Sequence, residues 1–325
     1  MTLPSNATRL PHTVSDRPFD PEAIYKYTDA QKALFEASQL RLMWWKFRRH
    51  KPALISGIFL GLLYFSILIS EFLAPYNLET RNSSHIYAPP QSIHLFHEGS
   101  FIGPFVYGFD FKLNMENLKR EYTPNPEKVQ PLRFFCSGDK YKFWGLVEAR
   151  FHFVCPAENG TFFLLGTDRL GRDVLSRMIY GARISLTIGL LGVGVSLVLG
   201  IVIGGMAGYY GGLFDVLSQR LIEVIQSLPS IPLWLALAAI LPITWSPIVV
   251  YFGITVILGE TTLSFLGLGL RPPITSWGVL LNEAQNINAV ALYPWLLWPV
   301  LPVVLVVLAY NFFGDGLRDA ADPYK

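Results

Sequence analysis

Charged side chains are scarce in this chain, and their distribution is uneven. Asp, Glu, Lys and Arg make up 15% of its 325 residues, whereas they make up about 25% of an average soluble domain. The stretch from Ile184 to Asn311 contains only Asp215, Arg220, Glu223, Glu260, Arg271 and Glu283. With a hydrophobic content of 51%, this scarcity excludes intrinsic disorder, a collagen-like chain and a free coiled coil. The sequence predicts an integral membrane protein with a sizeable polar part.

The chain also lacks the short motifs that mark enzymes and metal sites. Its two cysteines and six histidines form no C-x-x-C or H-E-x-x-H pattern, so we interpret His85, His94 and His97 as surface-loop residues. Neither a G-x-S-x-G elbow nor a nucleotide-binding P-loop is present. A net charge of +2 gives no reason to expect nucleic acid as a partner. We predict no catalytic, cofactor-binding or metal-binding residue in this chain.

The first long apolar run extends from Ala53 to Leu73 and can cross a hydrocarbon core of roughly 30 Å. A basic cluster between Arg41 and Lys51 precedes it, which by the positive-inside rule places the N-terminus in the cytoplasm. Residues 1–52 are then a cytoplasmic arm, too long and too polar for a cleaved signal peptide. Within the arm, residues 28–47 have apolar side chains at helical spacing, which predicts an interfacial helix; a soluble helix would show the same pattern.

Three further uncharged or nearly uncharged runs cover residues 184–208, 224–241 and 289–313. The first contains the pair Gly200 and Gly204, whose G-x-x-x-G spacing favours close helix packing in lipid. Prolines interrupt the other two, which indicates broken helices along a pathway or kinked packing. Residues 244–270 are also apolar, but as one helix they would place Glu260 in mid-membrane at a cost of roughly 2.5–3.5 kcal/mol.

A polar insert, residues 74–165, separates the first two spans. Strand-like pieces at 134–135, 141–144 and 161–165 predict a small β-rich domain on the far side of the membrane. Both cysteines, Cys136 and Cys155, fall inside it. In an oxidising compartment they could form a disulfide that contributes about 2–4 kcal/mol. Two buried free thiols are the alternative, because pairing cannot be read from sequence.

Three segments carry more specific information than hydropathy does. They are GTDRLGRDVLSRMIYGARISL at Gly166–Leu186, ETTLSFLGLGLRPPITSWG at Glu260–Gly278, and the C-terminal NFFGDGLRDAADPYK from Asn311. Together they resemble the C-type inner-membrane permease subunit of bacterial dipeptide and oligopeptide ABC transporters. The insert, with FVYGFDF and KYKFWGL, resembles the branch that includes microcin C and long-peptide importers.

The resemblance implies an all-α polytopic membrane protein, a helical bundle like that of type I ABC-importer permeases, with a small β-rich periplasmic insert. The permease core would be residues 166–325. Such a subunit lies in the bacterial inner membrane, pairs with a second permease and forms half of a peptide pathway. Two cytoplasmic ATPases bind ATP and drive it, and a periplasmic binding protein delivers peptide. The permease itself is then not an enzyme and binds no cofactor.

Several residues of the matched motifs are candidates for the pathway or for the start of the second span. They are Asp168, Arg172, Asp173, Arg177, Arg183, Glu260, Pro272, Pro273 and Trp277. The opposed charges from Asp168 to Arg183 can pair with one another, so we interpret them as orienting the second span; contact with substrate is the alternative. Pro272 and Pro273 end a helix and suit a gate-side loop or a plain turn.

One family feature is missing from its expected place. Members carry a cytoplasmic EAA-type coupling loop, which docks on the ATPase, between the fourth and fifth spans. Here WSPIVVYFGITVILG runs directly into ETTLSFLGLG, which suggests an internal deletion near residues 259/260. Five spans would place the C-terminus outside, whereas the family's six place it inside.

Three hypotheses follow for the function. The first is a peptide-importer permease subunit. The second is a transport-incompetent membrane scaffold that assembles with the partner permease but lacks coupling to the ATPase. The third, a membrane-anchored enzyme that uses the insert, depends only on scattered histidines and two cysteines.

Overall fold

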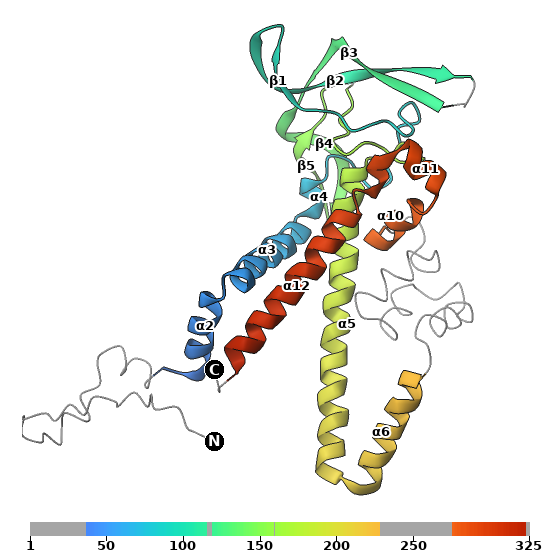
Figure 1. Cartoon of the computed structure of the whole chain (residues 1–325). Coiled ribbons are helices and arrows are strands. Elements are labelled where there is room, and N and C mark those ends of the chain that lie inside the picture. The colour runs from blue at the N-terminus through green and yellow to red at the C-terminus, as the bar shows by residue number, and fades with distance from the viewer. Residues whose placement is uncertain (1–36, 116–118, 159, 228–274, 323–325) are drawn as a thin grey trace, which may run out of the picture. The chain divides into compact units, whose positions relative to one another are not determined.

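The computed structural model describes residues 37–115, 119–158, 160–227 and 275–322 (Figure 1). The chain divides into two units. One contains residues 1–55 and 312–325, and the other contains residues 56–311. The insert and the first, second and last predicted spans are thus represented among the described residues.

The smaller unit joins the two ends of the chain. It contains α2 (Gln39–Arg49), the start of α3 (Lys51–Leu68) and the end of α12 (Val300–Ala321). Phe47 is buried beside Ala53, and its ring meets that of Phe313 edge-on at 5.6 Å. A Cβ on Gly316 would lie 2.1 Å from the Cβ of Ala53, so only glycine permits this close approach. Within the segment predicted as an interfacial helix, residues 28–47, the structure has a helix from residue 39, and the first part, 28–36, is outside the described residues.

Among the described residues, three helical segments are long and apolar enough to cross a membrane: Lys51–Leu68, Val174–Tyr210 and Pro294–Ala321. The first predicted span continues past a break at Ile69 as the short α4 (Ser70–Leu73). The second, α5 (Val174–Tyr210), begins ten residues before the predicted start at 184. It has 37 residues and is about 55 Å long, which exceeds the hydrocarbon thickness.

The last predicted span is broken at its prolines. It comprises α11 (Ile287–Leu292), a 3-10 turn at Pro294–Leu297 and α12. Proline lacks an N–H and clashes with the preceding turn, which explains why a continuous helix begins only at Val300. The third predicted run, 224–241, begins in α6 (Gly212–Ser227). The described residues do not include the remainder of this run, the stretch 244–270 or the junction at 259/260.

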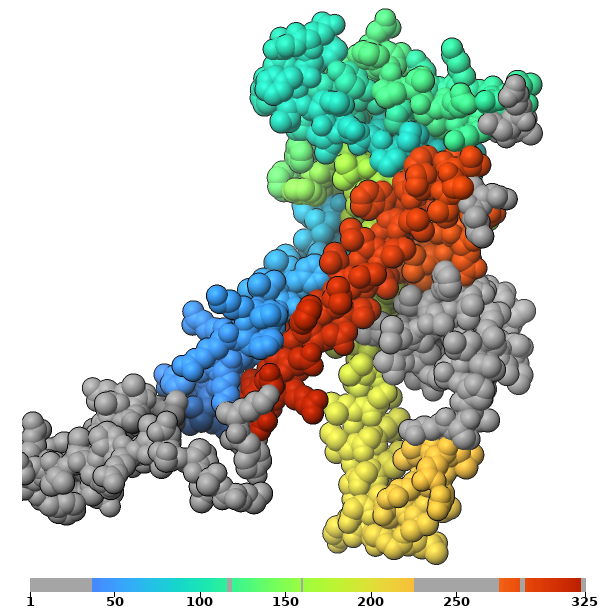
Figure 2. Space-filling view, viewed as in Figure 1, coloured from blue at the N-terminus to red at the C-terminus, as the bar shows by residue number. Residues whose placement is uncertain are grey.

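The helices of the larger unit pack around a small core. Ile67, Leu186 and Val306 bring α3, α5 and α12 together, and the hydroxyls of Tyr64 and Tyr310 hydrogen-bond to each other. Figures 1 and 2 show α3 and α12 side by side. Most other apolar side chains of α5 are exposed, and a Cβ on Gly200 or Gly204 would meet nothing within 4 Å, so the described residues do not show the close helix packing expected at this pair.

The insert forms two antiparallel sheets. The first has the order β1-β2-β3, with β1 (His94–His97), β2 (Ser100–Asn114) and β3 (Lys119–Pro131). The second is the hairpin of β4 (Arg133–Phe143) and β5 (Val147–Cys155). A disulfide between Cys136 and Cys155 links the two strands of this hairpin. A buried cluster of Val106, Leu132 and Phe162 packs between the sheets' ends, with Val154 beside it.

Two expectations for the insert are wrong. Residues 161–165 are not a strand, because the backbone N–H groups of Phe162 and Phe163 donate to the side chains of Tyr76 and Gln91, at 2.8 and 2.6 Å. His94 and His97 lie in strand β1, not in a loop, and their rings contact Phe105 and Tyr107. Among the described residues, no three His, Cys, Asp or Glu side chains are grouped to hold a metal ion.

Candidate functional site

The loop before α5 depends on glycine at two positions of the GTDRLGRD motif. Gly166 and Gly171 both have positive φ, at 79° and 70°. A Cβ on Gly171 would lie 2.0 Å from the carbonyl oxygen of Asn82, whose N–H donates to the Gly171 carbonyl at 3.0 Å. The loop therefore closes tightly on residues 82–88 and turns Asp168 inward.

Four charged side chains, here called the charge cluster, meet where this loop, α5 and α10 (Trp277–Glu283) converge. They are Asp168, Arg172, Arg177 and Glu283. Asp168 Oδ2 accepts from Arg172 Nε at 2.7 Å and from Arg177 Nη1 at 2.6 Å. Glu283 accepts from Arg177 through both carboxylate oxygens, at 2.7 and 2.9 Å, and from Arg172 at 3.1 Å.

The charge cluster is buried and neutral overall. The side chains of Asp168 and Arg177 are each 2% exposed, and that of Glu283 is 15% exposed. Two carboxylates offset two guanidinium groups, and Asp168 Oδ1 also accepts the backbone N–H groups of Leu170 and Arg172. Because transfer of an unpaired ion out of water costs several kcal/mol, each member depends on the others.

Asp173 has a different role from its neighbours. It caps α5, since its Oδ2 accepts from the backbone N–H and the hydroxyl of Ser176 at 2.8 and 2.7 Å. Burial raises the pKa of Asp173 to about 6, the bonds to Ser176 partly oppose this shift, and the charge of Asp168 adds to it.

Arg183 pairs with Glu71 at the end of the first span. The guanidinium carbon lies 3.8 Å from the centre of the Trp144 ring at the tip of the β4–β5 hairpin. Trp144 in turn donates its backbone N–H to Glu71 at 3.1 Å and its indole N–H to the Leu68 carbonyl at 3.0 Å. One ion pair and one tryptophan thus connect α5, α4 and the insert.

Trp277 joins the two motif segments. Its side chain is 4% exposed, and its indole N–H donates to the Met178 carbonyl at 3.1 Å. Its backbone N–H donates to Ser185 Oγ at 3.2 Å. A Cβ on Gly181 would meet Trp277 Cδ1 at 3.3 Å, so this glycine lets α10 approach α5 closely.

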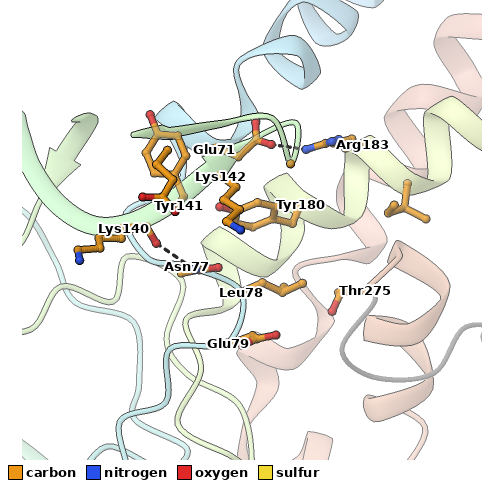
Figure 3. Close-up of a pocket in the computed structure, with 13 residues that line it drawn as sticks. Glu71, Asn77, Leu78, Glu79, Lys140, Tyr141, Lys142, Tyr180, Arg183 and Thr275 are labelled. Carbon is orange, nitrogen blue, oxygen red and sulfur yellow. Dashed lines mark hydrogen bonds and ion pairs between the residues drawn. The ribbon is translucent and has the colours of Figure 1, made fainter. Parts of the chain in front are cut away.

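A cavity of about 590 Å³ opens beside the Glu71–Arg183 pair (Figure 3). Its lining includes acidic and basic side chains and one tyrosine: Glu71, Glu79, Glu148, Lys140, Lys142, Arg183 and Tyr180. Such a lining can hold a ligand that carries both signs of charge, and it supplies binding groups rather than a visible nucleophile with its base.

The structure thus brings together Asp168, Arg172 and Arg177, and it places Asp173, Arg183 and Trp277 around the same start of α5. Glu260, Pro272 and Pro273 lie outside the described residues. Sequence reasoning missed Glu71 and Glu283 as partners of the arginines. The available signal was their isolation, because a lone carboxylate in an apolar stretch needs a partner when buried.

Replacement of Asp173 by asparagine tests the effect of its raised pKa. Below the ordinary aspartate pKa of about 4, the carboxyl is protonated in both folded and unfolded chains and burial carries no ionic penalty. As the pH rises to about 6, the unfolded chain ionises first, so the stability due to this group is lost. We therefore expect the parent to lose unfolding temperature relative to Asp173→Asn as the pH rises from about 4 to about 6. Above that pH the difference in unfolding temperature between the two proteins, measured in detergent, should stay constant.

The control is Asp173→Ala, which removes the cap as well as the charge. It should be less stable than the asparagine variant by about 1 kcal/mol at every pH. Parallel pH profiles for the parent and Asp173→Asn would contradict the account.

Comparisons with known proteins agree with these motifs. Residues 38–90 match the family described as the N-terminal TM domain of oligopeptide transport permease C. The glutathione transport system permease protein GsiD of Pectobacterium atrosepticum is 34% identical over an alignment of 217 residues. The aligned residues make up 49% of this chain and 72% of that protein. The dipeptide permease DppC of Alkalihalophilus pseudofirmus is 33% identical, and the match covers 49% of this chain and 71% of that protein. The oligopeptide permease OppC of Haemophilus influenzae is 32% identical, and the match covers 55% of this chain and 74% of that protein. The chain therefore belongs to the family of C-type permease subunits of peptide ABC transporters.

Proposed function

We propose that this chain is the transmembrane permease subunit of an ATP-driven peptide importer and forms half of the translocation pathway. The observation that carries the proposal is identity above 30% to permeases named for glutathione, dipeptides and oligopeptides, over more than two thirds of their length. Substrates named for these relatives are all small peptides, so the cargo of this chain is a peptide as well. ATP hydrolysis belongs to separate subunits, and the permease is not an enzyme.

The functional complex contains other permease, ATPase and binding-protein subunits. We assign to it a second permease, two cytoplasmic ATPases and a periplasmic peptide-binding protein. The described helices that can cross a membrane form part of a helical bundle of the type I importer kind, in the bacterial inner membrane. The basic cluster before the first span supports a cytoplasmic N-terminus.

We place the β-rich insert, residues 74–165, in the periplasm. The Cys136–Cys155 disulfide supports this side, because disulfides persist in oxidising compartments and are rare in the cytosol. The strands begin after the outer end of the first span and end before the charge cluster, so the insert and the cluster share that side.

The alignments support an internal gap in this chain. The match to GsiD extends over 217 residues, yet these include only 49% of the 325 residues here. The relative therefore has residues within the aligned region that lack a counterpart. We assign the gap to the coupling loop expected near residues 259/260. The scaffold alternative is not favoured, because these relatives are named as transport permeases.

Peptide uptake tests the proposal. In cells that contain the partner permease, ATPases and binding protein but lack this chain, its expression should restore uptake of labelled di- or tripeptide. Inactivation of the ATPase P-loop lysine should abolish that uptake, because the permease has no energy source of its own. Co-purification with the partners but no uptake would support the scaffold reading instead. A matched chain with a relative's coupling loop inserted after Gly259 shows whether the gap limits transport.

Cysteine labelling in intact cells tests the orientation separately. Glu127→Cys, on an exposed part of β3, should react with a membrane-impermeant maleimide that has access to the periplasm. Ser38→Cys, just before α2, should react only after the inner membrane is opened. The native cysteines do not interfere because they are bonded to each other. Labelling of Ser38→Cys from outside would contradict the proposed orientation.

A further inference from the structure

The β4–β5 hairpin has an apolar face that points away from the protein. In β5, Val147, Phe151 and Phe153 are separated by even numbers of residues and so share one side of the strand; they are 62%, 51% and 37% exposed. Phe134 and Phe135 of β4 complete this set, here called the aromatic face, and are also exposed. Strands of soluble domains bury the apolar side and expose the polar one, and in the described part of the chain nothing covers the aromatic face, so it suits an apolar partner.

The aromatic face is a connected cluster. The ring of Phe153 lies 5.3 Å from that of Phe135 and 6.0 Å from that of Phe134. Phe135 has a φ of 51°, an uncommon conformation for a bulky residue. This conformation lets two consecutive phenylalanines contact the same neighbour. Such strain persists only where the surrounding structure requires it.

The cluster is continuous with the end of the first span. The ring of Phe72, in α4, lies 5.7 Å from that of Phe151 and 6.0 Å from that of Phe153. Along α3, the exposed apolar residues Ile58, Leu62 and Phe65 are spaced as one helical stripe. This stripe suits contact with lipid, and Phe72 follows it in α4 after the break at Ile69, so the aromatic face continues the apolar surface of the first span.

The hairpin is also held firmly against this end of the span. His152, fully buried on the opposite side of β5, hydrogen-bonds the Ala74 carbonyl at 2.7 Å and the Asp139 carbonyl at 2.9 Å. At the tip, Trp144 donates to the Leu68 carbonyl, and the neighbouring Leu146 is 87% exposed. The position of the aromatic face relative to the end of the first span is therefore fixed.

We propose that the aromatic face of the β4–β5 hairpin lies in the outer interfacial layer of the bilayer and contacts lipid. Aromatic and aliphatic side chains gather at this layer because their apolar parts leave water while the strand's polar edge stays hydrated. A protein partner is a weaker candidate, since the face is continuous with the apolar end of the first span through Phe72 and consists mainly of apolar side chains, with Ser137 opposite Phe151 as its polar neighbour. The lipid contact does not depend on which peptide is carried.

Two neighbouring residues of β5 offer a matched test, because they point to opposite sides of the strand. Val147→Cys lies on the aromatic face, whereas Glu148→Cys lies beside the cavity. Each variant of the full chain is labelled with an environment-sensitive fluorophore and reconstituted in vesicles of phosphatidylethanolamine, phosphatidylglycerol and a brominated phosphatidylcholine. The Val147 label should emit at shorter wavelength and lose most of its fluorescence to the brominated lipid. Iodide in the buffer should quench mainly the Glu148 label.

The outcomes separate lipid from a protein partner. Leu146→Cys at the hairpin tip provides a second position and should behave as Val147→Cys does. Equal quenching of the Val147 and Glu148 labels by iodide, with no effect of brominated lipid, would overturn the proposal. Shielding of the Val147 label only after addition of the partner permease or binding protein would also overturn it and would assign the face to that protein.

Discussion

The pairing of Arg177 with Asp168 and Glu283 is the interaction on which the larger unit depends. A guanidinium that is 2% exposed is tolerated only with its countercharges in place. Because Asp168 comes from the glycine loop and Glu283 from the end of α10, the ionic requirement fixes three separate segments at the start of α5. Trp277 and Gly181 then set the close packing of α10 on α5 one turn further along.

A second ion pair extends this arrangement to the insert. Arg183 lies further along α5 than the charge cluster and forms an ion pair with Glu71. Trp144 packs its ring against the Arg183 guanidinium and donates hydrogen bonds to Glu71 and to the Leu68 carbonyl. The sheets are thus attached to the membrane helices through polar contacts with defined geometry. A permease that changes conformation during transport can keep such an assembly as one rigid element.

Much of this could be predicted from the sequence, and the reasons for the remainder are physical. Hydropathy located the first span, and the TDRLGRD segment was identified as a set of mutually pairing charges. Periodicity could not show that α5 starts at Val174, because Arg177 looks unsuited to a span until its partners are known. Glu283 and Glu71 were missed as partners because their isolation indicates only that they need a partner, and ion pairing across more than a hundred residues leaves no local pattern that identifies it. The segment 161–165 was mistaken for a strand because side chains of Tyr76 and Gln91 satisfy its backbone.

A double-mutant cycle on Arg177 and Glu283 tests the central claim most directly. Arg177→Met and Glu283→Leu each leave the buried charge cluster with one uncompensated charge and should each lower the free energy of unfolding by about 3–5 kcal/mol. The double variant keeps the Asp168–Arg172 pair and should lose much less than the sum of the two single losses. Glu158→Gln, which removes a partner from exposed Arg133, should cost no more than about 1 kcal/mol. Additive losses in the double variant, or single losses no larger than that of Glu158→Gln, would contradict the account.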